Sequence, residues 1–319
     1  MSVNGYDIIG DIHGHADALE VLLVKMGYRF IDGCYRHPDR VVIFLGDFID
    51  RGPKQRQVLN TVMPMVKYGG SKAVMGNHEF NALAFHTLDP SAKGQWLRAR
   101  TDKNINQHIA FLNEYLHSDK KEELESVLDF FLSLPIWLEL DGIRVVHACW
   151  EQNKINALGS AYLTPQLLVK ATTQGTVEYN AIETLLKGVE YALPLGNTWQ
   201  DKDGHSRGEV RIKWWVGQDS KLCDIAMPPG VLDGTDFKDK IIKAENLVGY
   251  DKANKPVFIG HYWMSAKKAP CLLADNVTCL DYSVAKGGKL VAYRWSGEEK
   301  LNEANFIYSS ENRELKKQA

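Results

Sequence analysis

The chain has 319 residues, of which 45% are hydrophobic and 24% are charged, and this composition excludes a disordered or fibrous protein. Its 38 basic and 40 acidic residues give a net charge of −2, so no overall charge favours nucleic acid or a membrane as a partner. We expect neither a signal peptide nor a membrane span, because no stretch has the required apolar length. The five scattered cysteines lack CxxC spacing, which favours reduced thiols and a cytoplasmic location.

Short apolar runs, mostly β-branched, occur at intervals along the chain, and a polar loop follows each of them. Between the first runs, residues 17–26 carry apolar side chains at helical spacing, and Pro53 begins a second helical face that ends at Gly69 and Gly70. Strands alternating with helices predict an α/β fold. The predicted strands are residues 6–9, 41–45, 73–75, 143–146 and 257–259.

The remaining segments are predicted less sharply. Residues 81–134 have a helical pattern, clearest over 122–132, and contain no further strand signal. Residues 151–245 combine helical segments with polar turns, and we expect them to form an insertion or cap within a single domain of residues 1–319.

Metal-ligand side chains follow all five predicted strands. In an open α/β sheet the functional crevice lies outside the carboxyl ends of the strands, so these side chains are expected to converge. Aspartate, histidine and asparagine without thiolates suit Mn, Fe or Zn, and six ligands suit two metals that share one carboxylate, here Asp47. Gly10, Gly14, Gly46 and Gly76 are expected to let the backbone turn beside the metals. The predicted ligands are Asp11, His13, Asp47, Asn77, His147 and His261.

The strand-end loops resemble the motifs of a known family. GDIHG (10–14), GDFIDRGP (46–53) and GNHE (76–79) are similar to the three signature motifs of the phosphoprotein phosphatase branch of calcineurin-like metallophosphoesterases. VVHAC (145–149) and FIGHYW (258–263) resemble its two later histidine motifs. The resemblance implies a β-sandwich flanked by helices, here with a mostly helical insertion, and a dinuclear site that hydrolyses phosphoesters by direct attack of a metal-bound water on phosphorus.

The resemblance also implies individual roles. Asp11, His13 and Asp47 would hold the first metal, and Asp47, Asn77, His147 and His261 would hold the second. His78 would be the general acid, Asp50 would orient it, and Arg51 would bind the phosphate together with Asn77. Acid–base histidines and bidentate arginines suit this chemistry.

Two departures from the family pattern concern the phosphate site. Ala148 and Cys149 replace the glycine pair that usually follows the fourth-motif histidine in eukaryotic members. The second phosphate arginine has no decisive match, and among Arg207, Arg211 and Lys213 we favour Arg211.

The residues in and around these motifs resemble those of bacterial members of the family more closely. These members are diadenosine-tetraphosphate hydrolases, small serine/threonine or tyrosine phosphatases, and the phosphatase modules of RNA-repair enzymes. The expected partner is therefore a phosphoprotein, a nucleotide or a small phosphoester. The alternatives are hydrolysis of dinucleoside polyphosphates and, in a different class, a non-catalytic phosphate-binding regulatory module. The sequence gives no oligomeric state.

For several other polar or aromatic residues, a structural role and a functional role are both conceivable. His15 is read as a helix-start residue, and Cys149 beside His147 as an unreactive thiol. Trp214, Trp215 and Trp263 could stack on a nucleobase, but core packing is the simpler reading for the first two. Surface or core placement is expected for His37, His86, His108 and His117, which lack partner spacing.

Overall fold

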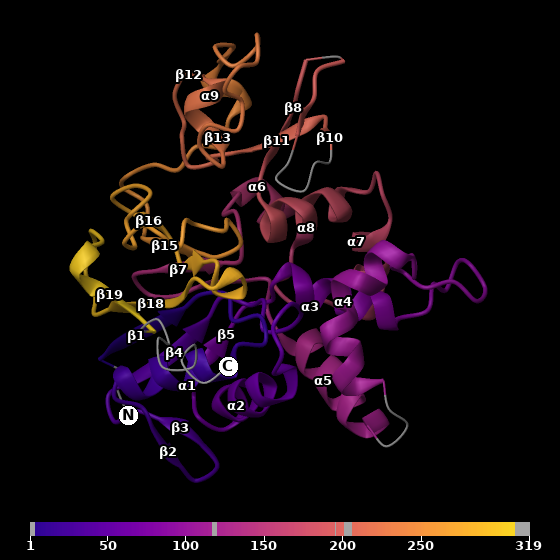
Figure 1. Ribbon diagram of the computed structural model, residues 1–319, viewed down its shortest axis with the longest axis vertical. Helices are drawn as coiled ribbons and strands as arrows, with labels where there is room; N and C mark the ends of the chain where they lie inside the picture. Colours follow the sequence, from indigo (N-terminus) through magenta and orange to yellow (C-terminus); the bar gives the residue numbers. More distant parts are fainter. Residues whose placement is uncertain (1–3, 117–119, 195, 201–205, 310–319) are drawn as a thin grey trace.

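The computed structural model describes residues 4–116, 120–194, 196–200 and 206–309. Two sheets form its centre (Figure 1). The first has the order β17-β18-β1-β4-β5, with β19 paired to β18, and consists of β1 (Gly5–Ile9), β4 (Arg40–Phe44), β5 (Lys72–Ala73), β17 (Asp281–Tyr282), β18 (Lys289–Trp295) and β19 (Phe306–Tyr308). The second has the order β16-β15-β7-β6 and consists of β6 (Trp137–Glu139), β7 (Arg144–Val146), β15 (Val257–Ile259) and β16 (Val277–Cys279).

The two sheets pack face to face, because alternate residues of their strands share one buried cluster. Ile8 and Ile43 of the first sheet lie in this cluster with Val145 and Phe258 of the second. Their neighbour Ile9 points the other way, into the larger cluster beneath the helices. This alternation is the period of two that a pleated strand imposes. The predicted α/β sandwich is confirmed.

Helices α1 (Ala16–Lys25) and α2 (Gln55–Lys67) cover the outer face of the first sheet (Figure 1). Their apolar stripes pack in the larger cluster, as predicted. The second helix begins at Gln55, two residues after Pro53, because Lys54 has a non-helical backbone (φ −129°) and serves as its N-cap. The Lys54 N–H donates to the carbonyl of Gly14 at 3.0 Å.

The helical region after β5 is broken into three helices. These are α3 (Asn77–His86), α4 (Asp102–Tyr115) and α5 (Lys121–Ser133). The last contains the predicted 122–132 stripe. Residues 87–101 form turns, and the side chain of Thr101 then caps α4 by accepting from the Asn104 N–H at 3.3 Å.

The expectation of a mostly helical insertion is met over residues 152–187 and not beyond. There α6 (Gln152–Leu158), α7 (Pro165–Thr172) and α8 (Val177–Lys187) pack together, with α8 against both of the others. Residues 189–242 instead form short strands around a small core of their own, because Val210 and Ile212 alternate with polar neighbours. The elements are β8 (Glu190–Ala192), β9 (Trp199–Gln200), β10 (Ser206–Arg207), β11 (Glu209–Ile212), β12 (Ser220–Lys221), α9 (Leu222–Ile225), β13 (Ala226–Met227) and β14 (Ile241–Ile242).

A few elements were not expected from the sequence. Strand β18 inserts antiparallel beside β1, and its register pairs Ile9 with Ala292. The sequence also did not predict strands β6, β16, β17 and β19 of the two sheets. Further unexpected elements are the hairpin β2 (Arg29–Ile31) and β3 (Cys34–Arg36), and the 3-10 turns η2 (Ala244–Asn246), η3 (Val284–Lys286) and η4 (Glu303–Asn305). Within the described ranges, no helix combines the length and the apolar character needed to cross a bilayer.

Candidate metal centre

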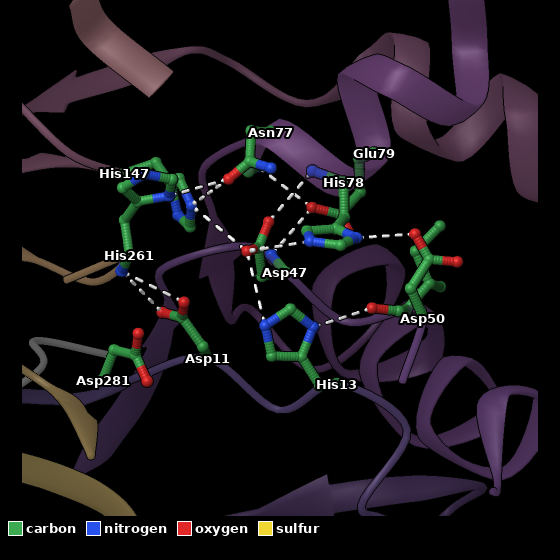
Figure 2. Close-up of polar contacts among 12 residues, drawn as sticks. Asp11, His13, Asp47, Asp50, Asn77, His78, Glu79, His147, His261 and Asp281 are labelled. Atoms are coloured by element: carbon green, nitrogen blue, oxygen red, sulfur yellow. Dashed lines mark hydrogen bonds and ion pairs between the residues drawn. The ribbon is translucent and has the colours of Figure 1, made fainter. Parts of the chain in front are cut away.

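The loops that leave both sheets meet at one place (Figure 2). Asp47 follows β4, which runs parallel to β1 and β5, so the three carboxyl ends share one edge. His147 and His261 follow β7 and β15, which are also parallel to each other. Residues separated by up to 250 positions in the chain thereby lie in contact.

Asp47 lies at the centre of the cluster. Its Oδ2 atom is 3.6 Å from His13 Nε2, 3.4 Å from His147 Nε2 and 4.0 Å from His78 Nε2. Asp47 is 2% exposed, so these contacts are shielded from bulk water. Two groups of potential ligand atoms, each within 4.8 Å, share this carboxylate: His13, Asp47 and His78, and Asp47, His147 and His261.

Backbone carbonyls fix the orientation of two of these imidazoles. His13 Nδ1 donates to the Ile49 carbonyl at 2.9 Å, and His147 Nδ1 donates to the Leu45 carbonyl at 2.7 Å. Each Nε2 atom is therefore directed toward Asp47, which is the arrangement found in metal-binding histidines. His13 Nε2 and His261 Nε2 are buried and have no hydrogen-bond partner among the described atoms, which fits ligation of a metal.

Asn77 and Asp11 complete the ring of predicted ligands (Figure 2). Asn77 Oδ1 lies 2.8 Å from His261 Nδ1 and 3.2 Å from His147 Nε2. Asp11 Oδ2 accepts from the His261 backbone N–H at 3.0 Å. The structure thus brings all six predicted ligands together, although Asp11 falls outside the two tight groups and His78 falls inside one.

The charges of the cluster favour divalent cations. Burial raises the pKa of Asp11, and the nearby Asp281 carboxylate raises it further. Burial also raises the pKa of Asp47, but His147 and His78 outweigh it and hold that pKa well below its usual range. Burial lowers the pKa of His13 to about 3, so this ring is a neutral donor. Buried carboxylates beside imidazoles are the donor set that binds transition metals.

His78 is oriented by Asp50 rather than by the ligand set. Its Nδ1 atom lies 2.5 Å from Asp50 Oδ2 and donates to it, and the second oxygen, Oδ1, lies 2.7 Å from His108 Nδ1. Burial disfavours the Asp50 carboxylate, but the two histidine hydrogen bonds outweigh this and lower its pKa to about 2. Asp50 is thus an ionised acceptor between two imidazoles.

Sequence reasoning missed three residues that support the site. Glu79 is fully buried and accepts from the backbone N–H groups of Asp47 at 2.8 Å, Phe48 at 2.8 Å and Gly76 at 3.0 Å. Glu79 is the last residue of the GNHE motif, and its place in that motif could have indicated that it supports the site. Asp281 lies behind Asp11 and accepts from the Trp263 N–H at 2.8 Å, and His108 contacts Asp50. No short motif marks these last two.

Backbone strain is concentrated in the same loops. Non-glycine residues adopt left-handed φ values at His13 (45°), Asp47 (50°), Asp50 (68°), Arg51 (70°), His261 (68°) and Trp263 (52°). Such values are unfavourable and persist where the surrounding structure enforces them, typically at functional sites. The glycines also serve close approach, because a Cβ atom on Gly46 would lie 2.3 Å from the Gly76 nitrogen.

Two arginines border the cluster. The Arg51 guanidinium lies 4.3 Å from the ring centre of Trp263. Arg211, on β11, lies 5.6 Å from the ring centre of Tyr262, and its charge adds to burial in lowering the pKa of His261. Of the other two candidates, Lys213 donates to the Asp224 carbonyl at 2.7 Å and Arg207 is exposed on β10.

The remaining candidate residues take structural positions. Trp214 is fully buried and donates to the Ala148 carbonyl at 2.9 Å, and Trp215 is 8% exposed. Cys149 is fully buried, and burial raises its thiol pKa, which disfavours a nucleophile. Among the described histidines, His15 stands at the start of α1, and His37 and His86 belong to neither ligand group. His117 lies outside the described residues.

Several known proteins are similar in sequence to part of this chain. A relative from Bacillus velezensis, named bis(5′-nucleosyl)-tetraphosphatase PrpE (asymmetrical), is 45% identical over 146 residues, which are 45% of this chain and 55% of the relative. A protein of the same name from Halalkalibacterium halodurans is 30% identical over 157 residues, or 48% and 61% of the two chains. The chain thus spans about half the length of the curated relatives it matches.

Similarity extends to solved structures and to a family model. A structure described as a putative diadenosine tetraphosphatase aligns with 97% of this chain and 95% of its own at 18% identity and a TM-score of 0.45. The model of the calcineurin-like phosphoesterase family matches residues 6–168, which include four of the five ligand loops. The chain therefore belongs to the calcineurin-like phosphoesterase family.

Proposed function

We propose that this chain hydrolyses phosphoesters at a site holding two divalent metal ions. The observation that carries this proposal is the position of Asp47 Oδ2, which lies within 4.0 Å of three imidazole Nε2 atoms at the meeting point of both sheets. A carboxylate surrounded by nitrogen ligands on opposite sides is suited to bridge two ions.

The ligands divide into two groups around Asp47. Asp11 and His13 would complete the first site, and Asn77, His147 and His261 would complete the second. His78 is assigned to acid catalysis instead of ligation, as the family resemblance implies, and its bond to Asp50 orients it for that role. When bound, the two ions would supply positive charge for the phosphate oxygens and lower the pKa of a water molecule.

The side chains of this chain would then orient and protonate the substrate. His78 donates Nδ1–H to Asp50, so its other nitrogen is free to give a proton to the leaving oxygen. Arg51 and Arg211 would bind phosphate oxygens together with the Asn77 amide. Bidentate guanidinium groups match phosphate geometry, and both arginines border the ligand cluster.

Three further properties belong to this proposal. We assign manganese as the preferred ion, because mixed carboxylate and imidazole ligands suit it, with iron or zinc as substitutes. The chain would act in the cytoplasm, where its five thiols stay reduced. Residues 151–245 would form a cap within one domain of residues 1–319, since the Trp214 indole donates to Ala148 beside the His147 loop.

A second candidate function is hydrolysis of dinucleoside polyphosphates. It is favoured by the name of the relatives, one of them 45% identical over 146 residues. The half-buried ring of Trp263 packs against Arg51 and Lys286, which places an aromatic side chain next to a phosphate-binding cation. Both functions use the same metals and the same acid, and they differ in the substrate bound.

One experiment separates these functions. Purified protein is assayed for bound metal and for turnover of an aryl phosphate, phosphoserine and phosphotyrosine peptides and diadenosine tetraphosphate with added manganese. About two metals per chain and release of inorganic phosphate support the phosphomonoesterase. Release of nucleotides from diadenosine tetraphosphate as the preferred reaction supports the second function. Tight phosphate binding without turnover of any substrate refutes both and identifies a non-catalytic regulatory module.

A further inference from the structure

Asp50 has two histidine partners, and only one of them belongs to the proposed reaction. His78 Nδ1 lies 2.5 Å from Oδ2, and His108 Nδ1 lies 2.7 Å from Oδ1. An ionised carboxylate is only an acceptor, so both imidazoles must donate from Nδ1. The three side chains therefore form one chain of hydrogen bonds, running from the interior of α4 to the metal centre.

The surroundings of His108 do not by themselves require a histidine. It projects from α4, is 5% exposed, and stacks on Phe111 with ring centres 4.7 Å apart. Phe85 and His86 surround the same ring at 5.3 and 5.6 Å. Its Nε2 atom has no hydrogen-bond partner among the described atoms. A phenylalanine would satisfy this packing, so the bond to Asp50 is the interaction that uses the imidazole.

The Asp50 carboxylate needs such a restraint. Its backbone is held at a φ of 68°, and its N–H donates to Gln55 Oε1 at 2.7 Å, but neither contact fixes rotation of the carboxylate group. A cavity of about 20 Å³ opens beside it, large enough for one water molecule. The cavity is also lined by Arg98, whose positive charge attracts Asp50. Without a bond at Oδ1, water or Arg98 would compete with His78 for the carboxylate.

We propose that His108 is a positioning residue for the acid step, which holds the Asp50 carboxylate in the orientation that directs His78 toward the leaving oxygen. This inference rests on the proposed phosphoester hydrolysis at the same site. His108 belongs to neither group of ligand atoms, and its link to the reaction runs through Asp50 and His78. Its effect should therefore depend on how much the substrate needs the acid.

The test uses three variants and two substrates. His108→Phe keeps an aromatic ring against Phe111 and removes the donor, and His108→Asn restores a donor near the position of Nδ1 without the ring. His86→Phe is the matched control, because it changes a histidine of the same aromatic cluster that does not contact Asp50. The substrates are phenyl phosphate, a poor leaving group, and 2,4-dinitrophenyl phosphate, a good one. Bound manganese and thermal unfolding are measured for each variant.

We expect His108→Phe to lower kcat on phenyl phosphate by about 10- to 100-fold, as loss of an orienting partner typically does. The loss on 2,4-dinitrophenyl phosphate should be much smaller, with KM and bound metal unchanged. His108→Asn should recover most of the activity on phenyl phosphate even if it unfolds at a lower temperature. His86→Phe should behave as the wild type on both substrates.

Some contrary results would overturn the inference alone, and one would refute the proposed function. Equal losses on the two substrates, or the same losses in His86→Phe, would give His108 a purely structural role and overturn the inference. If His108→Phe does not fold, His108→Asn still tests the inference. A His108→Asn protein that has wild-type metal content but lacks the expected activity on phenyl phosphate overturns the inference as well. A wild-type protein that hydrolyses neither substrate refutes the proposed function itself, and the inference falls with it.

Discussion

The strand-end loops and residues 189–242 contribute to the same site in opposite ways. The loops hold buried ionisable side chains on strained backbone, with Asp11, His13 and Asp47 each 2% exposed, and the two large clusters of the sandwich support them. Residues 189–242 have only a small core, and from it Arg211 reaches the border of the site with a side chain 28% exposed. Buried charge requires rigid surroundings, whereas contact with a substrate requires reach and access.

The largest effect should follow removal of the central carboxylate. In Asp47→Ala both metal groups lose their shared oxygen, so binding of both ions and turnover should fall together, turnover by at least about 10⁴-fold, since metal charge stabilisation is worth several kcal/mol. Metal analysis and single-turnover assays measure the two. A variant that retained two metals and normal turnover would show that Asp47 is not the bridge.

The second-largest effect should come from a variant of the strand-end loops that loses the acid step but keeps the metals. His78→Asn should keep both metals, because the proposed function assigns His78 to proton donation and other side chains to the metals. Its kcat on phenyl phosphate should fall by about 10² to 10³-fold, which is the size of a general-acid contribution. Steady-state kinetics with good and poor leaving groups measure it. An unchanged rate on the poor leaving group would remove His78 from the acid role.

A smaller effect is expected from removing the positive charge of Arg211, which lies in residues 189–242. Arg211→Gln should lower kcat/KM by about 10- to 100-fold, because a charged hydrogen bond to phosphate contributes about 1.5–3 kcal/mol. The matched control is Lys213→Gln, which removes a cation two residues away that points to the Asp224 carbonyl. Initial-rate kinetics compare the two, and equal effects would deny Arg211 a specific contact with the substrate.

The smallest effect on activity should come from the core of residues 189–242. Ile225 is 1% exposed in that core, and Ile225→Ala should lower the free energy of unfolding by about 2–5 kcal/mol through the cavity it leaves. Metal content should stay at the wild-type value, because the ligand loops pack in other clusters. Calorimetry and metal analysis test this. Loss of metal in this variant would show that the two regions form one cooperative unit.

The sequence carried most of the information about the loops. Each strand-end motif is local, because the residues that turn the backbone and those that present ligand atoms lie within a few positions of each other, as in GDIHG and GNHE. The rule that such loops meet at the carboxyl ends of parallel strands then predicted that Asp11, Asp47 and His147 come together. The family and the α/β fold followed from the same motifs and are confirmed.

Contacts between distant segments were not encoded in any short pattern. The pairing of β18 with β1, the division of residues 81–134 into three helices and the strands of residues 189–242 depend on which apolar faces find partners in three dimensions. The same is true of Asp281 behind Asp11 and of His108, which lies 58 residues from Asp50.

The sequence by itself therefore determined the family, the α/β fold and the type of chemistry, because the motif residues carry their own turns and ligand atoms. Tertiary structure alone decided which histidine shares the Asp50 carboxylate and which cation of the second region borders the site. The physical reason is that a hydrogen bond or ion pair depends on distances of a few ångströms between side chains, and packing of the whole chain sets those distances.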